Sequence, residues 1–257
     1  MAQGRDDEPG YVKTTETSFA IIEQLRDAGG ATVTDLAERL DLSKSTVHSH
    51  LRTLRHLGYV VEENDSHYLG LKFLDLGDVA RARRNLYEVS KREMDELVST
   101  VNEHGYVMVE ELNRGVYIYQ STTERAVQTD SHIGTTVDLH ATAVGKAYLA
   151  HLSADKRADL LDQLAFQPRT ESTITDRERF EEELATVREE GVAFNDEERF
   201  VGMRAVGAPV PGPDDETLAA ISVAGPTTRL DGERYHTGLP EMVEETAHII
   251  GLRATYS

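Results

Sequence analysis

The stretch DLSKSTVHSHLRTLRHLGYV, residues 41–60, constrains the fold of the chain more than any other feature. Val47, Leu51 and Leu54 recur at intervals of four and three residues, which is the spacing of one face of an α-helix. Ser43 stands directly before this helix, where a serine oxygen can accept a free backbone N–H group. A shorter apolar pattern at helical spacing, residues 36–40, precedes the turn at residues 41–43. The stretch therefore predicts two helices joined by a tight turn.

The residues on either side of this pair complete a compact unit. A first helix is expected from Ser18, as its N-cap, to the glycine pair 29–30, and Thr34 is expected to cap the second helix. After the third helix, YVVEENDSHYLGL (59–71) has two β-prone runs around a polar turn, which predicts a hairpin. Three helices followed by a hairpin are typical of a winged helix-turn-helix, which we place at residues 12–73.

The charges of the chain are distributed unevenly. Asp and Glu number 46 against 27 Lys and Arg, which gives a formal net charge of −19. Residues 43–57 nevertheless hold three histidines, two arginines and one lysine without a single acid. A local basic segment in such an acidic chain indicates an anionic partner, and on the later helix of a helix-turn-helix that partner is double-stranded DNA.

Composition narrows the class of protein further. The chain has no cysteine, which excludes disulfides, thiolate metal sites and thiol nucleophiles. It shows no signal-peptide pattern, and no apolar run reaches the roughly 18 residues of a membrane helix. We therefore expect a soluble, cytoplasmic protein with no membrane association. The high acid content, with only six lysines, favours a halophilic, haloarchaeal source.

The C-terminal part of the chain mixes helices and strands. Helical spacing predicts a linker helix at 74–90, with Val79 among the residues expected to be buried. The elements expected after it are two strands around a turn at 113–115, helices at 143–152, 155–164 and 176–190, strands at 204–210 and 218–224, and a last helix at 235–250. Because they do not alternate as regular βαβ units, the prediction is an α+β domain over residues 91–257.

Five segments resemble the IclR family of transcriptional regulators, and they occur in the family's order. LSKSTVHSHLRTLRHLGYV is similar to the family's recognition helix, and HYLGLKFLDLG is similar to its wing exit. DLHATAVGKAYLA resembles the start of its signature helix, while GVAFNDEERFVGMRAVGAPV and AAISVAGPTTRL resemble its C-terminal core. The resemblance implies an N-terminal winged helix that binds DNA and a C-terminal GAF-like domain that binds a small-molecule effector. It also implies a homodimer, or a dimer of dimers, on a palindromic operator.

The candidate DNA contacts lie on the third helix. Base edges in the major groove are read by donors and acceptors on the exposed early turns of a recognition helix, whereas later positions more often meet phosphates. We therefore expect base contacts from Lys44, Ser45, Thr46, His48 and Ser49, and phosphate contacts from Arg52 and Arg55. For His48, an ordinary surface histidine is the alternative. The wing carries Glu62, Glu63 and Asp65, so strong binding of the wing to the DNA backbone is not expected.

The candidate effector pocket is built around the segment HATAVGK, residues 140–146. Small side chains open the start of this helix, so Ala143 and Val144 could present backbone N–H groups to a carboxylate or phosphate. By matching motifs, the family resemblance adds Asn195, Met203, Ala205, Ser222, Ala224 and Thr129. Simple packing is the alternative for the methionine and the alanines. The implied effector is an organic acid or a sugar-derived metabolite, and no cofactor is expected.

Other classes of function fit the sequence less well. A metabolic enzyme with an accessory DNA- or protein-binding module could use the acids 196–198, or His140 with Asp138, for acid–base chemistry. Neighbouring residues in a strand point to opposite faces, however, and no nucleophile elbow, phosphate-binding loop or HExxH metal motif accompanies them. A pure protein-interaction module does not account for the acid-free, donor-rich helix. We therefore expect a regulator without enzyme activity or a bound metal.

Overall fold

The computed structural model describes residues 10–83, 85–127, 130–213 and 216–256. The chain divides into two compact units, Met1–Arg83 and Arg84–Ser257. The predicted linker at 74–90 spans the division between them. None of the described helices is both long and apolar enough to cross a membrane.

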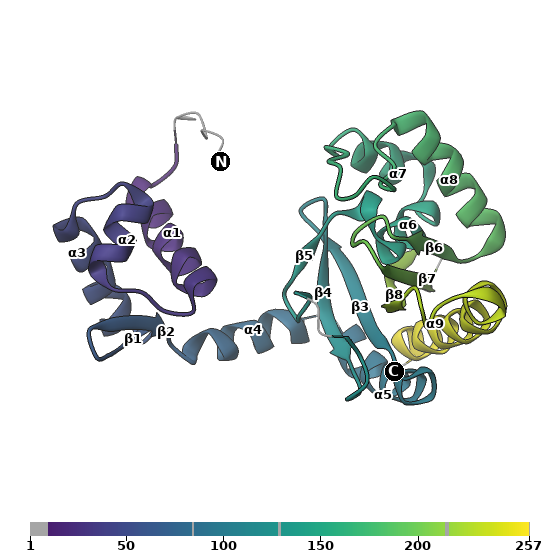
Figure 1. Ribbon diagram of the computed structural model, residues 1–257, viewed down its shortest axis with the longest axis horizontal. Helices are drawn as coiled ribbons and strands as arrows, with labels where there is room; N and C mark the ends of the chain where they lie inside the picture. The colour runs from purple at the N-terminus through teal and green to yellow at the C-terminus, as the bar shows by residue number, and fades with distance from the viewer. Residues whose placement is uncertain (1–9, 84, 128–129, 214–215, 257) are drawn as a thin grey trace. The chain divides into compact units, whose positions relative to one another are not determined.

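The first unit contains three helices, a two-stranded hairpin and a fourth helix (Figure 1). In order these are α1 (Lys13–Ala28), α2 (Val33–Leu40), α3 (Lys44–His56), β1 (Val60–Glu63), β2 (Ser66–Leu69) and α4 (Lys72–Ala82). Strands β1 and β2 pair antiparallel, and the turn residues Asn64 and Asp65 have φ of 50° and 65°. Asn and Asp tolerate this left-handed conformation, which matches the twist of a two-residue hairpin. The predicted winged helix-turn-helix is confirmed.

The first helix begins earlier than predicted. Helix α1 starts at Lys13, so Ser18 lies inside it and not at its N-cap. The Ser18 hydroxyl donates to the Thr14 carbonyl oxygen at 3.0 Å and lies 2.8 Å from the His50 Nδ1 atom. Serine can bond back to the preceding turn without leaving a helix, and here it also connects α1 to α3.

The second helix has a different cap from the predicted Thr34. The Thr32 hydroxyl accepts the Asp35 N–H, and the Asp35 carboxylate accepts the Thr32 N–H. This reciprocal capping box satisfies two backbone donors at once, which explains why the helix begins there. The predicted cap of α3 is confirmed, because the Ser43 hydroxyl accepts the Thr46 N–H at 3.1 Å.

The second unit is a six-stranded sheet with helices on both faces (Figure 1). Its elements are α5 (Leu86–Val101), β3 (His104–Glu111), β4 (Arg114–Ser121), β5 (Thr136–Val137), the 3₁₀ turn η1 (Leu139–Ala141), α6 (Ala143–Ala150), α7 (Ala154–Leu161), α8 (Arg177–Glu190), β6 (Ala193–Asp196), β7 (Met203–Pro211), β8 (Thr217–Pro226), the π-helical turn η3 (Arg234–Gly238) and α9 (Leu239–Tyr256). The strand order is β5-β4-β3-β8-β7-β6, and all neighbouring strands are antiparallel. The predicted α+β class is confirmed.

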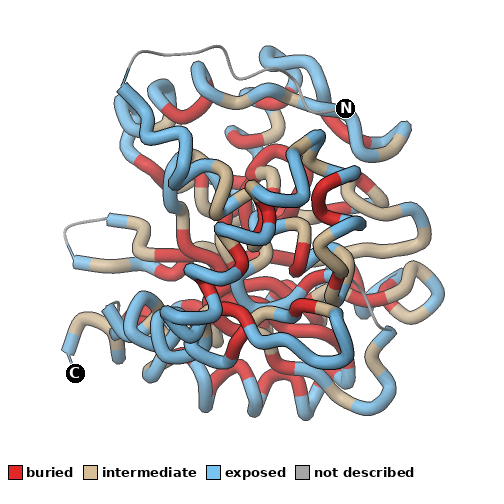
Figure 2. The backbone as a smooth tube through the Cα atoms, turned by 90° about the vertical axis from the view of Figure 1, so that its left-hand side faces the viewer, coloured by how far each residue is buried: buried red, intermediate tan, exposed pale blue. Residues whose placement is uncertain are grey.

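Alternation along the strands gives this unit two hydrophobic cores, one on each face of the sheet. In β8, Ala219, Ile221 and Val223 pack into the core shared with α5 and α9, whereas Ala220 and Ala224 face the core shared with α6 and α8. Buried and exposed residues alternate along α5 and α9, which bury the side that meets the sheet, whereas α6 is buried along almost its whole length because α8 covers it (Figure 2). The sheet therefore has an α6 face and an α9 face, each with its own core.

Helix α4 overturns one expectation about burial. Val79 is 68% exposed, and α4 contains no buried residue within its own unit. Leu71, Leu74 and Leu76 are also exposed, at 81%, 65% and 47%. Apolar residues at helical spacing predict that a helix forms but do not identify what covers it.

Two glycines fix the position of the first turn of α6. A Cβ atom on Gly145 would lie 2.1 Å from the Leu139 carbonyl oxygen, so η1 packs directly on the helix. A Cβ atom on Gly207 of β7 would lie 2.8 Å from the backbone carbonyl of Ala143. Any side chain at either position would displace backbone, so the start of α6 is held between η1 and the sheet.

His140 provides a pH test of this packing. Burial lowers the pKa of His140, so the folded protein keeps the ring neutral while the unfolded chain takes up a proton below about pH 6.5. Its contribution to stability is therefore complete above that pH and is lost as the pH falls towards the folded pKa. Urea unfolding at about pH 7.5 and about pH 5.5 should show a smaller loss of stability in His140→Asn than in the wild type. Equal losses would show that His140 does not titrate on unfolding.

Candidate nucleic-acid interface and ligand pocket

The exposed side of α3 carries the predicted DNA contacts. Val47, Leu51 and Leu54 are buried in the core of the first unit, which leaves the opposite side of α3 to solvent. Thr46 is half-buried, and the other six predicted contacts are exposed: Lys44, Ser45, His48, Ser49, Arg52 and Arg55. His56 follows Ser49 and Arg52 at helical spacing and is also exposed, although it was not among the predicted contacts.

These polar residues differ in how many hydrogen-bonding groups remain available. The hydroxyls of Ser45 and Thr46 each lie 2.8 Å from the Ser43 hydroxyl, and Ser49 donates to the Ser45 carbonyl oxygen at 2.9 Å. Three longer side chains make no hydrogen bond or ion pair with any residue that the structure describes: Lys44, His48 and Arg52. The long side chains are therefore the free donors of this surface.

Arg55 differs from the other cations of α3. Its guanidinium forms an ion pair with Glu62 of the wing strand β1. The same carboxylate lies 3.9 Å from Nε2 of His67, a buried residue whose pKa is lowered mainly by its burial. A phosphate would therefore have to compete with Glu62 for Arg55.

A pocket opens in the second unit between the α6 face of the sheet, the start of α6 and the loop after β6. Its empty volume is about 460 Å³, part of which is open to solvent. Seven of the predicted effector residues line it: Ala143, Val144, Asn195, Met203, Ala205, Ser222 and Ala224. Thr129 lies outside the described residues. Seven further lining residues were not predicted: Tyr106, Tyr117, Ser131, Thr142, Arg199, Phe200 and Arg204.

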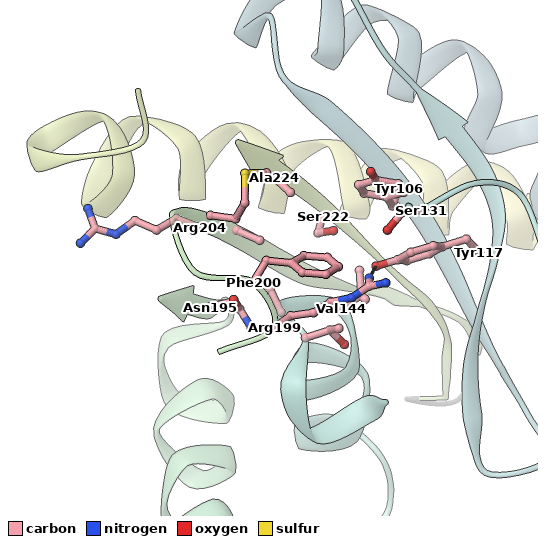
Figure 3. A pocket seen from close by; sticks show the side chains of 14 residues that line it. Tyr106, Tyr117, Ser131, Val144, Asn195, Arg199, Phe200, Arg204, Ser222 and Ala224 are labelled. Atoms are coloured by element: carbon pink, nitrogen blue, oxygen red, sulfur yellow. Dashed lines mark hydrogen bonds between the residues drawn. The ribbon is translucent and has the colours of Figure 1, made fainter. Parts of the chain in front are cut away.

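Aromatic rings and a guanidinium group form one wall of the pocket. The rings of Tyr106 and Tyr117 stack with centroids 4.5 Å apart and an angle of 24°. Figure 3 shows the Arg199 guanidinium beside Tyr117, where Nη1 donates to the phenolic oxygen at 3.2 Å. The Arg199 Cζ atom lies 4.7 Å from the centroid of Phe200. Burial raises the pKa of Tyr117 to about 12, so its hydroxyl stays protonated at neutral pH.

The other lining arginine is fully engaged. Arg204 binds both carboxylate oxygens of Asp196, at 2.7 and 3.1 Å, and donates to the Leu230 carbonyl oxygen at 3.0 Å. In Figure 3 its side chain extends away from the other labelled residues. The hydrogen bond that Arg204 donates to Asp196 raises the pKa of Arg204, in keeping with a tightly paired charge.

Asn195 lines the pocket with its polar atoms already occupied. Its Nδ2 donates to the Ala141 carbonyl oxygen at 2.8 Å, and its Oδ1 accepts the Glu198 N–H at 3.3 Å. Thr142 is likewise occupied as the N-cap of α6, where its hydroxyl accepts the Gly145 N–H at 3.2 Å. Both residues hold the pocket wall together.

The acids at 196–198 do not form a catalytic pair. Asp196 is bound by Arg204 of β7. Glu197 accepts the Gly202 N–H at 2.6 Å, which closes the loop after β6. Glu198 is buried and lies 2.6 Å from the buried Lys146 ammonium, which anchors this loop on α6. Each carboxylate has its own structural partner, so they do not converge on one substrate.

His140 and Asp138 are also separately engaged. The Nε2 atom of His140 donates to the Gln167 carbonyl oxygen at 2.9 Å, and Arg169 Nε donates to Asp138 at 2.6 Å. Within the described parts of the chain, no group of three or more His, Asp or Glu side chains is placed to hold a metal ion. The geometry gives neither acid–base alternative any support.

Comparison with known proteins agrees with this architecture. The family model described as the IclR helix-turn-helix domain matches residues 15–64, and that of the bacterial transcriptional regulator IclR C-terminal domain matches residues 79–252. The HTH-type transcriptional regulator ArcR of Halobacterium salinarum is 33% identical over 250 residues, covering 96% of this chain and 95% of the relative. The HTH-type transcriptional regulator KdgR of Escherichia coli is 31% identical over 231 residues, covering 89% and 88%. A crystal structure of a transcriptional regulator from Rhodococcus sp. RHA1 is 29% identical, has a TM-score of 0.82, and covers 94% of this chain and 98% of that one.

The chain belongs to the IclR family of transcriptional regulators. It is a DNA-binding regulator rather than an enzyme, as the names of its relatives also indicate. Its acid-rich composition and its similarity to a Halobacterium regulator agree with a halophilic source.

The ion pair between Arg55 and Glu62 gives a test on the DNA-binding face. Glu62→Gln should tighten DNA binding by about two- to fivefold, because it releases Arg55 for a phosphate and an exposed ion pair contributes little to stability. Glu63→Gln removes the same charge from the same strand without touching an arginine, and should have a smaller effect. Fluorescence anisotropy with a labelled duplex measures both. Equal effects would attribute the change to wing charge alone.

Proposed function

We propose that this regulator binds an operator through α3 and that an organic acid, including sugar-derived acids, in the pocket of the second unit changes this binding. In this division of roles, residues 12–73 bind DNA, residues 74–90 link the domains, and residues 91–257 bind the effector and support assembly. Family membership and the free donors of α3 support the proposal. Because its target is the genome, the protein acts in the cytoplasm.

The proposal that the effector is an acid rests on the charge of the residues that line the pocket. The described lining contains two arginines and no Asp or Glu, although acids outnumber bases 46 to 27 in the chain. The amides of Ala143 and Val144 in the first turn of α6 add partial positive charge. Such a lining favours an anion and disfavours a cation.

Exposed apolar residues of the first unit support the proposal that the protein assembles into a homodimer or a dimer of dimers. Leu71, Leu74, Leu76 and Val79 lie on or next to α4, and Phe19 of α1 is 57% exposed. Several large apolar side chains left exposed on one helix are typical of protein–protein contacts. Two copies of α3 related by a twofold axis would read a palindromic operator.

The DNA-binding role is tested with a duplex selected from a random pool by the wild-type protein. The double variant Lys44→Ala, Arg52→Ala should lose about a hundredfold or more in affinity, because it removes two of the free donors of α3. Arg26→Ala is the control, since this arginine lies on α1 and pairs with Asp27. Undiminished retention of the duplex by the double variant in a gel-shift assay would reject this placement of the interface.

Assembly through α4 is tested by sedimentation velocity at constant protein concentration. The variants Leu74→Asp and Val79→Asp should shift the protein towards the monomer, because each places a charge among exposed apolar side chains. Leu112→Asp, at the tip of the β3–β4 hairpin and 88% exposed in the wild type, should leave assembly unchanged. Unchanged assembly in both α4 variants would exclude this surface from the interface.

A further inference from the structure

The crevice between α3, the wing and the start of α2 contains a buried histidine whose ring makes no hydrogen bond. His67 of β2 is 5% exposed and lines this crevice, which has an empty volume of about 860 Å³, part of it open to solvent. Its Nδ1 atom has no hydrogen-bond partner among the described residues. Its Nε2 atom lies 3.9 Å from the Glu62 carboxylate, which is too far for a hydrogen bond. Buried polar atoms are normally hydrogen-bonded, so the ring has unused bonding capacity.

The acid next to His67 is already paired with another cation. The Glu62 oxygen that lies 3.9 Å from the His67 ring is also the oxygen that forms the ion pair with Arg55. While His67 is neutral, Arg55 is the only described cation paired with Glu62. A phosphate that takes Arg55 would therefore leave the Glu62 carboxylate, which is 32% exposed, without a counter-charge.

Protonation of His67 would change this balance. A protonated imidazole donates from both ring nitrogens, and a shift of about 1 Å would bring Nε2 within hydrogen-bonding distance of Glu62. The ring could then replace Arg55 as the partner of Glu62. Glu62, Arg55 and a neutral His67 together carry no net charge, and the proton raises this charge to +1. Uptake of one proton thus compensates the phosphate that Arg55 binds.

The surroundings of His67 favour its neutral form until DNA is bound. Burial lowers the pKa of His67, Glu62 opposes this effect, and Arg55 and His48 add to it. The ring is therefore neutral in the free protein at neutral pH. Movement of Arg55 towards a phosphate, and the phosphate itself, both favour the protonated ring. The start of α2 adds no charged side chain to the crevice, and the other charged residues that line it are Arg52 and Asp65.

We propose that DNA binding through α3 is coupled to the uptake of a proton by His67, which replaces Arg55 at Glu62 and allows Arg55 to bind a backbone phosphate. The affinity for DNA therefore rises as the pH falls from about 8 towards about 5.5, and it levels off once His67 is protonated in the free protein. This inference rests on the proposed DNA-binding role of α3 and adds a pH dependence to it.

The first test measures the Kd for the selected duplex by fluorescence anisotropy at about pH 8 and about pH 5.5, at constant salt. The wild-type Kd should fall by about two- to fivefold on acidification, the same factor by which Glu62→Gln tightens binding at the higher pH. The Kd of Glu62→Gln should change less with pH, because Arg55 is free at both values. A wild-type Kd that does not change, or an equal change in Glu62→Gln, would overturn the inference.

Single substitutions identify the histidine that is responsible. His67→Gln keeps a hydrogen-bonding side chain but takes up no proton, so most of the pH dependence should be lost. His48→Gln is the matched control on the exposed side of α3 and should keep the wild-type ratio of the two Kd values. Circular dichroism at both pH values checks that each variant is folded. If His67→Gln does not fold, the comparison of the wild type with Glu62→Gln decides the question. Persistence of the pH dependence in a folded His67→Gln variant, or its loss in His48→Gln, would overturn the role of His67.

Titration calorimetry measures the proton directly. DNA binding at about pH 6.5 in two buffers of different ionisation enthalpy gives the number of protons taken up by the complex. The wild type should take up roughly half a proton or more per bound chain beyond the uptake of His67→Gln. Equal uptake by the two proteins would overturn the inference.

The outcomes separate this inference from the proposed function. If the double variant Lys44→Ala, Arg52→Ala loses affinity while the wild-type Kd does not respond to pH, the coupling to His67 is rejected and the DNA-binding role of α3 stands. If the double variant retains the duplex, the interface on α3 is rejected, and the role of Arg55 as a phosphate contact is rejected with it.

Discussion

The ligand pocket depends on a steric constraint at one point of the second unit. Strand β7 passes the first turn of α6 so closely that Gly207 has no room for a side chain against Ala143. This contact sets the helix start against the sheet face that carries Ser222, and the buried pair of Lys146 and Glu198 fixes the following loop on the same helix. Arg199 belongs to that loop. A shift of α6 would therefore displace the amides of its first turn and Arg199 together, relative to Ser222 on the sheet.

The two candidate sites follow the same electrostatic principle. In a chain with net charge −19, most of the surface repels anions, and binding depends on cations that lack a carboxylate partner. Lys44 and Arg52 on α3 are such cations, whereas Arg55 is neutralised by Glu62. In the pocket the corresponding contrast is between Arg199 and Arg204. Local pairing, rather than the number of basic residues, therefore defines where an anion can bind.

Sequence patterns predicted much of the fold, because they reflect interactions between near neighbours. The buried stripe of α3, its serine cap and the hairpin turn are local, and each was confirmed. The start of α1 was predicted wrongly because the helix begins after Val12 without a side-chain cap, so no capping residue marks its first turn in the sequence. Motif matching found seven pocket residues. Whether Arg199 has a close carboxylate partner, however, depends on distances to segments far away in the sequence. The exposure of Val79 was not predicted either, because helical spacing does not show which segments pack against a helix.

A regulator of this kind requires that occupation of the pocket changes DNA binding through α3. This coupling is tested most directly by the affinity of the intact protein for its selected duplex, measured at constant salt with and without a saturating amount of the acid that the pocket binds. If the two sites are coupled, the acid changes the Kd for DNA by about fivefold or more in the wild type and leaves it unchanged in Arg199→Gln. A Kd for DNA that stays the same while the pocket is demonstrably occupied would show that the two sites are not coupled.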